Sequence, residues 1–187
     1  MAQQDPQPPL DSETLRRAMR AWTTGVTVIT AAHDGQQYGM TVNSFTSISL
    51  EPPLVCVTLK RLTHTHELVE KSGEFAVTIL SAAQEELSAR FAGKRPQVTD
   101  RFEGVPTTTL SIPAPLIEGG MAFFNCRVLS ARAVGENTLF VAEVIAAKGE
   151  GVMALLQAPI VYLSGDQDLD SITEEEVALL RDYVQQG

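Results

Sequence analysis

The chain has 187 residues, of which 44% are hydrophobic and 20% are charged, proportions typical of a globular domain and not of a disordered chain. Its net charge of −9 argues against nucleic acid or an anionic membrane surface as a partner. No stretch approaches the roughly 20 apolar residues that a membrane-spanning helix needs, and the first residues lack the features of a secretory signal. These observations predict a cytoplasmic protein of one domain.

The N-terminal segment divides into an arm and a helix. Residues 1–11 are polar and contain several prolines, so we expect a flexible arm. The spacing over residues 12–22 predicts a helix that begins at Ser12. Three apolar side chains would share one face of it: Leu15, Met19 and Trp22.

Strand patterns then follow in quick succession. Segments 25–32 and 38–50 alternate in polarity around an Asp-Gly turn at 33–37. Further strands are predicted at 54–59, 74–80, 121–134, 138–149 and 159–166, with the turn Gly-Glu-Asn at 135–137. The alternation and the short links favour an antiparallel sheet, closed or half-closed into a barrel, over a doubly wound parallel sheet.

Helices lie between and after these strands. One is predicted over 64–73 with Gly73 at its end, and a second over 82–93 with a Ser81–Gln84 capping box. The stretch 94–120 is rich in Pro, Thr and Gly, and is either a long loop or an excursion over a site. Residues 167–187 form an acidic segment with a helix that would pack on the barrel or a second copy, or dock a partner.

Several common kinds of site are missing from the sequence. It has no GxGxxG motif, no Walker-type phosphate loop and no GxSxG nucleophile elbow. Cys56 and Cys126 lie in apolar strands without a CxxC motif, which indicates buried, reduced thiols. A metal pair at His64 and His66 is less favoured than a polar helix start, because residues two apart do not share a helix face. We therefore expect no metal.

Hydroxyl-bearing residues recur around Asn43, at Thr41, Ser44, Thr46, Ser47 and Ser49. They form either the polar face of a plain strand or a wall that lines a site. Such a wall suits a polyhydroxylated, phosphorylated ligand whose flat ring lies against Phe45 or Phe91. The strand interpretation fits Asn43 poorly, because Asn is depleted in strands.

A second hydroxyl pair, Thr63 and Thr65, directly precedes helical residues 66–71. Helix N-termini bind anions through free N–H groups and the helix dipole. Positive charge is supplied nearby by Lys60, Arg61, Lys94 and Arg95. Together these features predict a phosphate-bearing cofactor.

These segments carry a family resemblance over residues 13–165. The blocks TGVTVIT and GMTVNSFTSISLEPPLV, followed by ARFAG, DRFEGVP, PLIEGGMAFFNCRV and TLFVAEV, resemble the flavin reductase family with the FMN-binding split-barrel fold. The resemblance implies a mainly β fold with peripheral helices, an antiparallel Greek-key split β-barrel over residues 12–166. It also implies a homodimer that binds FMN or FAD and reduces it with NADH or NADPH, often for a flavin-dependent monooxygenase.

The resemblance also implies roles for particular residues. The flavin ring and its ribityl chain would lie along Met40, Thr41, Val42, Asn43, Ser44, Phe45, Thr46 and Ser47. Thr63 and Thr65 match the S-x-T that contacts the phosphate, while Phe91 and Lys94 would close the cofactor side. No catalytic acid or base is expected, because hydride passes directly between the two cofactors.

One position departs from the family pattern. Family members often carry Gly-Asp-His at the hairpin tip, with the His on the nicotinamide side, whereas this chain has Asn137 there. Asn forms hydrogen bonds but carries no charge. The alternative function is therefore a split-barrel protein that binds flavin or haem without NAD(P)H reductase activity. Asn137 is otherwise explained as a turn residue with left-handed backbone.

Overall fold

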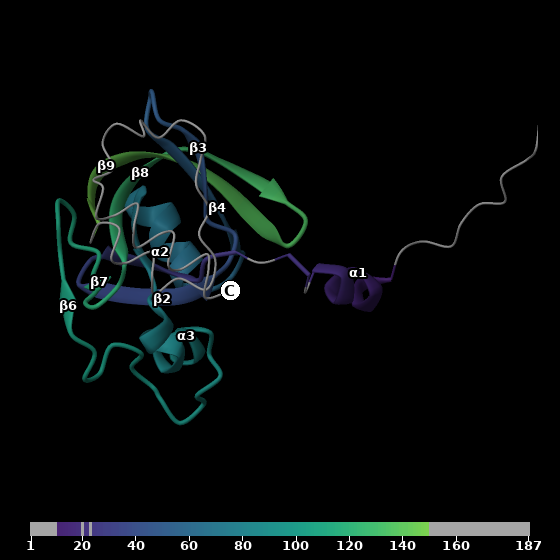
Figure 1. The fold of residues 1–187 in the computed structure, drawn as a ribbon. Helices are drawn as coiled ribbons and strands as arrows, with labels where there is room; N and C mark the ends of the chain where they lie inside the picture. The colour runs from purple at the N-terminus through teal and green to yellow at the C-terminus, as the bar shows by residue number, and fades with distance from the viewer. Residues whose placement is uncertain (1–10, 20, 23, 150–187) are drawn as a thin grey trace, which may run out of the picture.

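A computed structural model describes residues 11–149 except 20 and 23, and it is built around one antiparallel sheet (Figure 1). The strands of this sheet are β1 (Thr27–His33), β2 (Gln36–Val42), β3 (Thr46–Ser49), β4 (Leu54–Lys60), β5 (Glu74–Ile79), β8 (Ala122–Val134) and β9 (Asn137–Gly149). They lie in the order β2-β1-β5-β8-β9-β4-β3, so β2 and β3 are the two edges. The mainly β fold predicted from the sequence is confirmed.

The sheet is strongly curved, and its curvature follows from chain connectivity. The edge strands β2 and β3 are separated only by residues 43–45. Four peptide steps reach at most about 14 Å, so the two edges must approach each other there. They do not pair, which leaves an open split in the barrel. The prediction of one continuous strand over 38–50 is wrong, because the chain crosses this split between Val42 and Thr46.

Two hairpin turns depend on backbone with positive φ. Asp34 and Gly35, between β1 and β2, have φ of 50° and 75°, as a twisted two-residue hairpin requires. At the β8–β9 tip only Gly135 and Glu136 are unpaired, because Val134 pairs with Asn137. Asn137 therefore lies in β9, and its interpretation as a left-handed turn residue is wrong; the positive φ belongs to Gly135.

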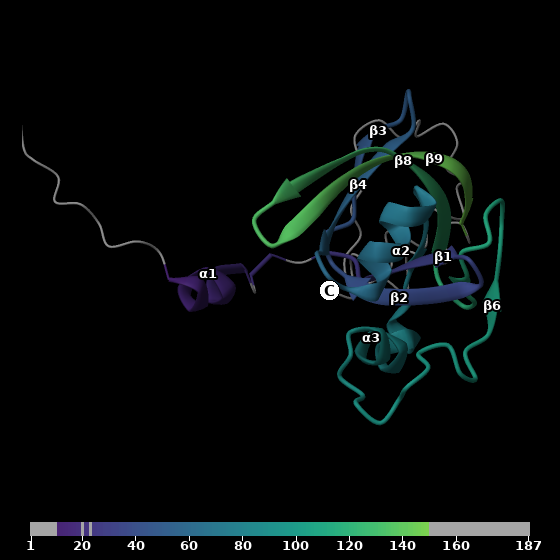
Figure 2. The same ribbon diagram turned by 180° about the vertical axis from the view of Figure 1, so that it is seen from behind.

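Helix α2 (His64–Ser72) lies within the curve of the sheet (Figures 1 and 2). Its Leu68 and Val69 are buried against strand residues that include Ile29, Val57 and Phe140. Gly73 ends the helix with φ of 68°, as predicted. Burial of this helix face fills the barrel interior and so holds α2 in place relative to the strands.

Helix α3 (Glu85–Phe91) follows a short 3₁₀ turn, η1 (Ala82–Gln84). The Gln84 side chain accepts a hydrogen bond from the Ser81 backbone N–H at 3.1 Å, as the capping box predicted. The predicted helix over 82–93 is thus confirmed, with a tighter first turn.

Residues 94–120 form a packed excursion. They contain a small hairpin of β6 (Thr107–Thr108) and β7 (Leu116–Ile117). The excursion is joined to the barrel by buried polar side chains: Thr30 donates to the Pro115 carbonyl, Thr78 accepts from the Ile117 N–H, and Asn125 accepts from the Ser111 and Ile112 N–H groups. Ile112, Ala114 and Leu116 are buried against the sheet, so this part of the excursion belongs to the core.

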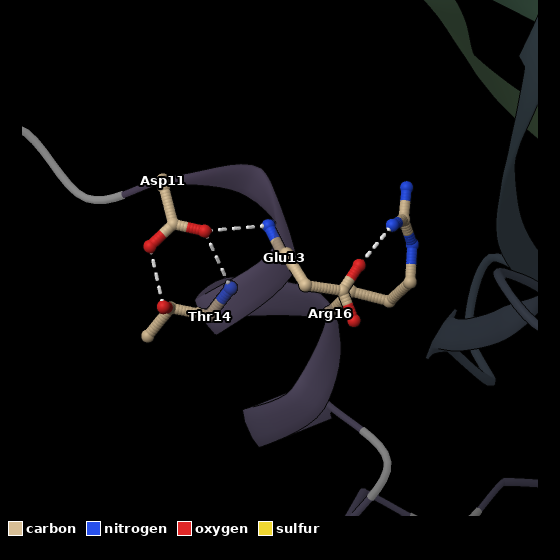
Figure 3. Close-up of polar contacts among 4 residues, drawn as sticks. All are labelled: Asp11, Glu13, Thr14 and Arg16. Carbon is tan, nitrogen blue, oxygen red and sulfur yellow. Dashed lines mark hydrogen bonds and ion pairs between the residues drawn. The ribbon is translucent and has the colours of Figure 1, made fainter.

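Helix α1 (Ser12–Met19) has no buried residue and lies to one side of the sheet (Figure 1). Figure 3 shows that Asp11, not Ser12, caps it, because the Asp11 carboxylate accepts from the N–H groups of Glu13 and Thr14. The helix ends at Met19, three residues short of the prediction over 12–22, and the residues of the predicted apolar face, Leu15, Met19 and Trp22, are 50% to 68% exposed.

The described residues contain no helix long and apolar enough to cross a membrane. Residues 1–10 of the arm predicted over 1–11 lie outside the described residues. The predicted strand over 159–166 and the acidic C-terminal segment over 167–187 also lie outside them.

Candidate functional site

Most of the predicted site residues lie around the split of the barrel. Residues 43–45 cross it, and the N-terminus of α2 lies beside Met40, whose sulfur is 3.9 Å from Thr63 Oγ1. The β8–β9 tip reaches the same region through the loop after β4. Segments distant in the sequence are thus brought together here.

The hydroxyl-bearing segment divides into bonded and exposed side chains. Thr41 Oγ1 donates to the Ser88 carbonyl of α3 at 2.7 Å, and Ser44 Oγ bonds to the backbone of Thr58. Both hydroxyls therefore hold the protein together. Asn43, Thr46 and Ser47 are exposed, and these three remain available to a ligand.

The apolar residues of the segment face inward. Met40, Val42 and Phe45 are partly buried against the main core cluster. The Phe45 ring lies 5.7 Å from that of Phe124, measured between centroids. Each of these three side chains is packed against the core on one side and open to solvent on another. The solvent-exposed apolar parts could contact the face of a flat ring.

Phe91 is placed differently from Phe45. Its side chain is fully buried, and its ring contacts that of Phe102 with centroids 5.1 Å apart. A Cβ built on Gly39 would lie 2.9 Å from the Phe91 ring, so β2 passes directly over this residue. Phe91 supports the strand from beneath, and of the two predicted phenylalanines only Phe45 reaches solvent.

The first turn of α2 presents hydrogen-bond donors. Thr63 is the N-cap, and its Oγ1 accepts from the His66 N–H at 3.4 Å. First-turn N–H groups have no partner within a helix, so those of His64 and Thr65 are free to bind an anion. Thr65 is 1% exposed, and its buried Oγ1 has no hydrogen-bond partner. An unpartnered buried hydroxyl in this turn is a second observation that points to a ligand.

The basic side chains that were predicted to supply positive charge are partly committed to other groups. Lys60 Nζ lies 3.2 Å from Glu136 Oε2, and Arg61 Nη2 donates to the Gly135 carbonyl at 2.6 Å. Arg95 pairs with Glu86, and the Glu86 carboxylate raises the pKa of that guanidinium. Lys94 is exposed and has no ion-pair partner within 4.0 Å among the described residues.

Asn137 lies where β9 begins, paired with Val134 of β8 and Lys60 of β4. It is partly exposed. The Arg61 N–H donates to the Glu136 carbonyl at 3.0 Å, which holds the hairpin tip against the loop that leads into α2. Asn137 and Thr63 therefore flank the same loop.

Three side chains that the sequence did not single out for this site form a row beside it. The rings of Tyr38 and His64 have centroids 5.0 Å apart, and the Arg101 guanidinium lies 4.9 Å from the Tyr38 ring. Arg101 Nη1 also donates to the carbonyls of Gly39 and Phe91. No local pattern marks these residues, because they come from three separate elements.

The thiols are not part of this arrangement. Both cysteines are free, and burial raises the pKa of the Cys126 thiol to about 12. In the described part of the chain, no cluster of three His, Cys, Asp or Glu residues has the placement of a metal site.

Taken together, the groups around the split fit a ligand with a phosphate and a flat ring. The helix turn supplies N–H donors and a positive dipole end for the phosphate. Exposed polar groups at Asn43, Thr46 and Ser47 offer hydrogen bonds, and Phe45 offers an apolar surface. This donor set matches a flavin nucleotide.

Known proteins support this interpretation. Residues 19–166 match the family model described as flavin reductase like domain. The chain is 41% identical over 138 residues to the NADH-dependent flavin reductase StyB of Pseudomonas fluorescens, covering 73% of this chain and 78% of StyB. It is 34% identical over 157 residues to the reductase subunit HsaB of a flavin-dependent monooxygenase of Mycobacterium tuberculosis, covering 84% of this chain and 81% of HsaB.

A solved structure agrees in fold as well as sequence. The Streptomyces globisporus NADH:FAD oxidoreductase SgcE6, in complex with NAD and FAD fragments, superposes with a TM-score of 0.70 at 36% identity. The match covers 76% of this chain and 84% of that one.

Proposed function

The chain belongs to the flavin reductase family, and we propose that it transfers hydride from NADH to FMN or FAD and supplies reduced flavin to a partner monooxygenase. The observation that carries this proposal is the turn of α2 with its unpartnered Thr65 hydroxyl, set beside the exposed polar residues of the split. The relatives named as NADH-dependent reductases and monooxygenase reductase subunits favour it over a flavin- or haem-binding protein without reductase activity.

In this proposal the protein binds and orients the flavin and the nicotinamide, and the chemical step takes place between these two cofactors. Thr63, Thr65 and the α2 N–H groups hold the phosphate, and exposed Lys94 adds charge. Met40 to Ser47 lie along the ring and ribityl chain. Bound flavin supplies a ring that accepts hydride from dihydronicotinamide, so no side chain serves as acid or base. Asn137 offers a neutral hydrogen-bonding group on the nicotinamide side.

We also propose that the protein is a cytoplasmic homodimer and that NADH is preferred over NADPH. Leu15 and Met19 of α1 and Trp22 just beyond it are exposed apolar side chains, and they support a second copy as the group that covers them. The named relatives that specify a nicotinamide cofactor specify NADH. The choice between FMN and FAD is left to the assay.

The decisive experiment follows nicotinamide oxidation by the purified full chain with FMN, FAD or no added flavin, with NADH and NADPH tested separately. Fast oxidation of NADH that requires flavin is the expected result. Tight flavin binding without oxidation of either nicotinamide would overturn the reductase proposal. Sedimentation of the same sample tests the dimer independently.

A further inference from the structure

His66 is a buried histidine that the reaction described above does not use. It lies in the first turn of α2 and is 3% exposed. Its Nε2 is 2.8 Å from Thr138 Oγ1, and its ring packs edge-on against Phe140, with centroids 5.6 Å apart. Both contacts are to β9, the strand that begins at Asn137.

The surroundings of the ring indicate which nitrogen carries the proton. Nδ1 makes no hydrogen bond and lies 3.5 Å from a carboxylate oxygen of Glu70. A bare Nδ1 lone pair would face this negative charge, whereas an Nδ1–H would be attracted to it. Nε2 then accepts a hydrogen bond from the Thr138 hydroxyl.

The His66–Thr138 bond joins two parts of the proposed site. Within the described residues it is the only side-chain hydrogen bond between α2 and β9. Thr138 is adjacent to Asn137, and His66 is adjacent to Thr65. The backbone of Asn137 pairs with Val134 and Lys60, while the other side-chain ties of the hairpin tip, through Lys60 and Arg61, are exposed, so water competes with those two.

We propose that His66 is a positioning residue: through Thr138 it sets where Asn137 stands relative to the first turn of α2, and so it governs how nicotinamide meets the bound flavin. This inference rests on the proposed function. The buried hydrogen bond between His66, in the first turn of α2, and Thr138, near the start of β9, keeps its geometry better than solvent-exposed contacts do. Loss of this hydrogen bond should therefore make the tip of the β8–β9 hairpin more mobile and leave the barrel folded.

The test compares Thr138→Val, His66→Leu and His66→Gln with the unchanged chain. Thr138→Val is nearly isosteric and removes only the hydroxyl. Thr78→Val is the matched control, because it removes a buried hydroxyl that bonds to the 94–120 excursion instead. Hydrogen exchange of amides 133–138 and separate KM values for NADH and flavin are measured for each.

For Thr138→Val and His66→Leu we expect exchange at 133–138 to accelerate about tenfold and the KM for NADH to rise about fivefold, the scale of one buried hydrogen bond. The KM for flavin should change less than about twofold, and His66→Gln should recover most of the NADH effect. Equal shifts in both KM values, or an equal response to Thr78→Val, would overturn the positioning role.

The two proposals fail separately. If the unchanged chain oxidises no NADH with any flavin, the reductase proposal fails. The exchange measurement still decides whether His66 holds the hairpin: unaltered exchange at 133–138 in Thr138→Val overturns the positioning role whatever the activity.

Discussion

The Ser44 side chain bonds to both backbone groups of Thr58: its Oγ donates to the Thr58 carbonyl at 2.9 Å and accepts from the Thr58 N–H at 3.2 Å. In the β3–β4 register Thr46 is opposite Cys56, so Ser44 stands opposite Thr58. The side chain thus extends the β3–β4 ladder to a point two residues before β3 begins, where the chain crosses the split. It stabilises the segment that presents Asn43 and Phe45.

Replacement of this serine tests that role. Ser44→Ala should lower the free energy of unfolding by about 2 kcal/mol, because two hydrogen bonds are lost and both Thr58 groups are left without them. Ser47→Ala is the control, since Ser47 is exposed and its change should stay within about 0.5 kcal/mol. Urea unfolding measures both. Equal stability of the two variants would contradict the role of Ser44.

Gly39 is required for the approach of β2 to Phe91. A Cβ there would lie 2.9 Å from the Phe91 ring and 3.1 Å from Thr30 Cγ2. We expect Gly39→Ala to destabilise the protein by about 1–3 kcal/mol through overpacking. Gly25→Ala, where a Cβ meets nothing within 4 Å, is the control. Phe91→Leu combined with Gly39→Ala should recover part of the loss in a thermal melt; strict additivity would count against the clash.

Thr63 links helix capping to the proposed phosphate site. Thr63→Ala removes the N-cap oxygen and should cost about 1 kcal/mol of stability. If the phosphate binds at this turn, the KM for FMN should rise about fivefold while that for riboflavin, which lacks the phosphate, stays level. Thr63→Ser keeps the hydroxyl and is the control. A parallel rise for both flavins would place the phosphate elsewhere.

Replacement of Asn137 tests whether this residue contributes to NADH binding. Asn137→Ala should raise the KM for NADH by up to about tenfold, the scale of one hydrogen bond, with little effect on flavin. Glu136→Gln is the neighbouring control, because it alters only the exposed pair with Lys60. Steady-state kinetics with each substrate varied in turn measures both. An unchanged KM for NADH in Asn137→Ala would remove this residue from the site.

Cys126 makes stability fall at high pH. Burial raises the pKa of its thiol to about 12, so the folded protein keeps it neutral while the unfolded chain ionises it above about 9. The folded state thus binds more protons between these pH values, and its stability should decline there by at most about 1.4 kcal/mol per pH unit. Cys126→Ala should show a shallower decline between pH 9 and 11 by urea unfolding, although it starts from a lower stability. Identical slopes would contradict a buried, neutral thiol.

Local patterns were sufficient for most of the secondary structure. The Asp-Gly turn after β1, the helix ended by Gly73 and the Ser81–Gln84 contact all depend on residues close in sequence, and each was predicted from them. The hydroxyl segment and the Thr63–Thr65 pair predicted a phosphate-bearing cofactor, and the sequence blocks carried the resemblance to the flavin reductase family. All of these are patterns of residues close together in the sequence.

Where side chains point was decided by tertiary structure. Alternation across residues 38–50 looks like one strand, but curvature of the sheet breaks it at 43–45 and turns the Ser44 hydroxyl toward Thr58. Phe91 and Phe45 look equivalent in the sequence, yet packing under Gly39 buries only Phe91 completely.

The hydrogen bond between His66 and Thr138 is the clearest contact that local sequence patterns do not predict. The two residues are 72 positions apart, and no local preference of either one specifies the other. They meet because apolar burial of Leu68 and Val69 seats α2 inside the barrel. The sequence alone thus determined most of the elements and the resemblance to the family, while long-range packing decided which polar groups face each other and which remain open to a ligand.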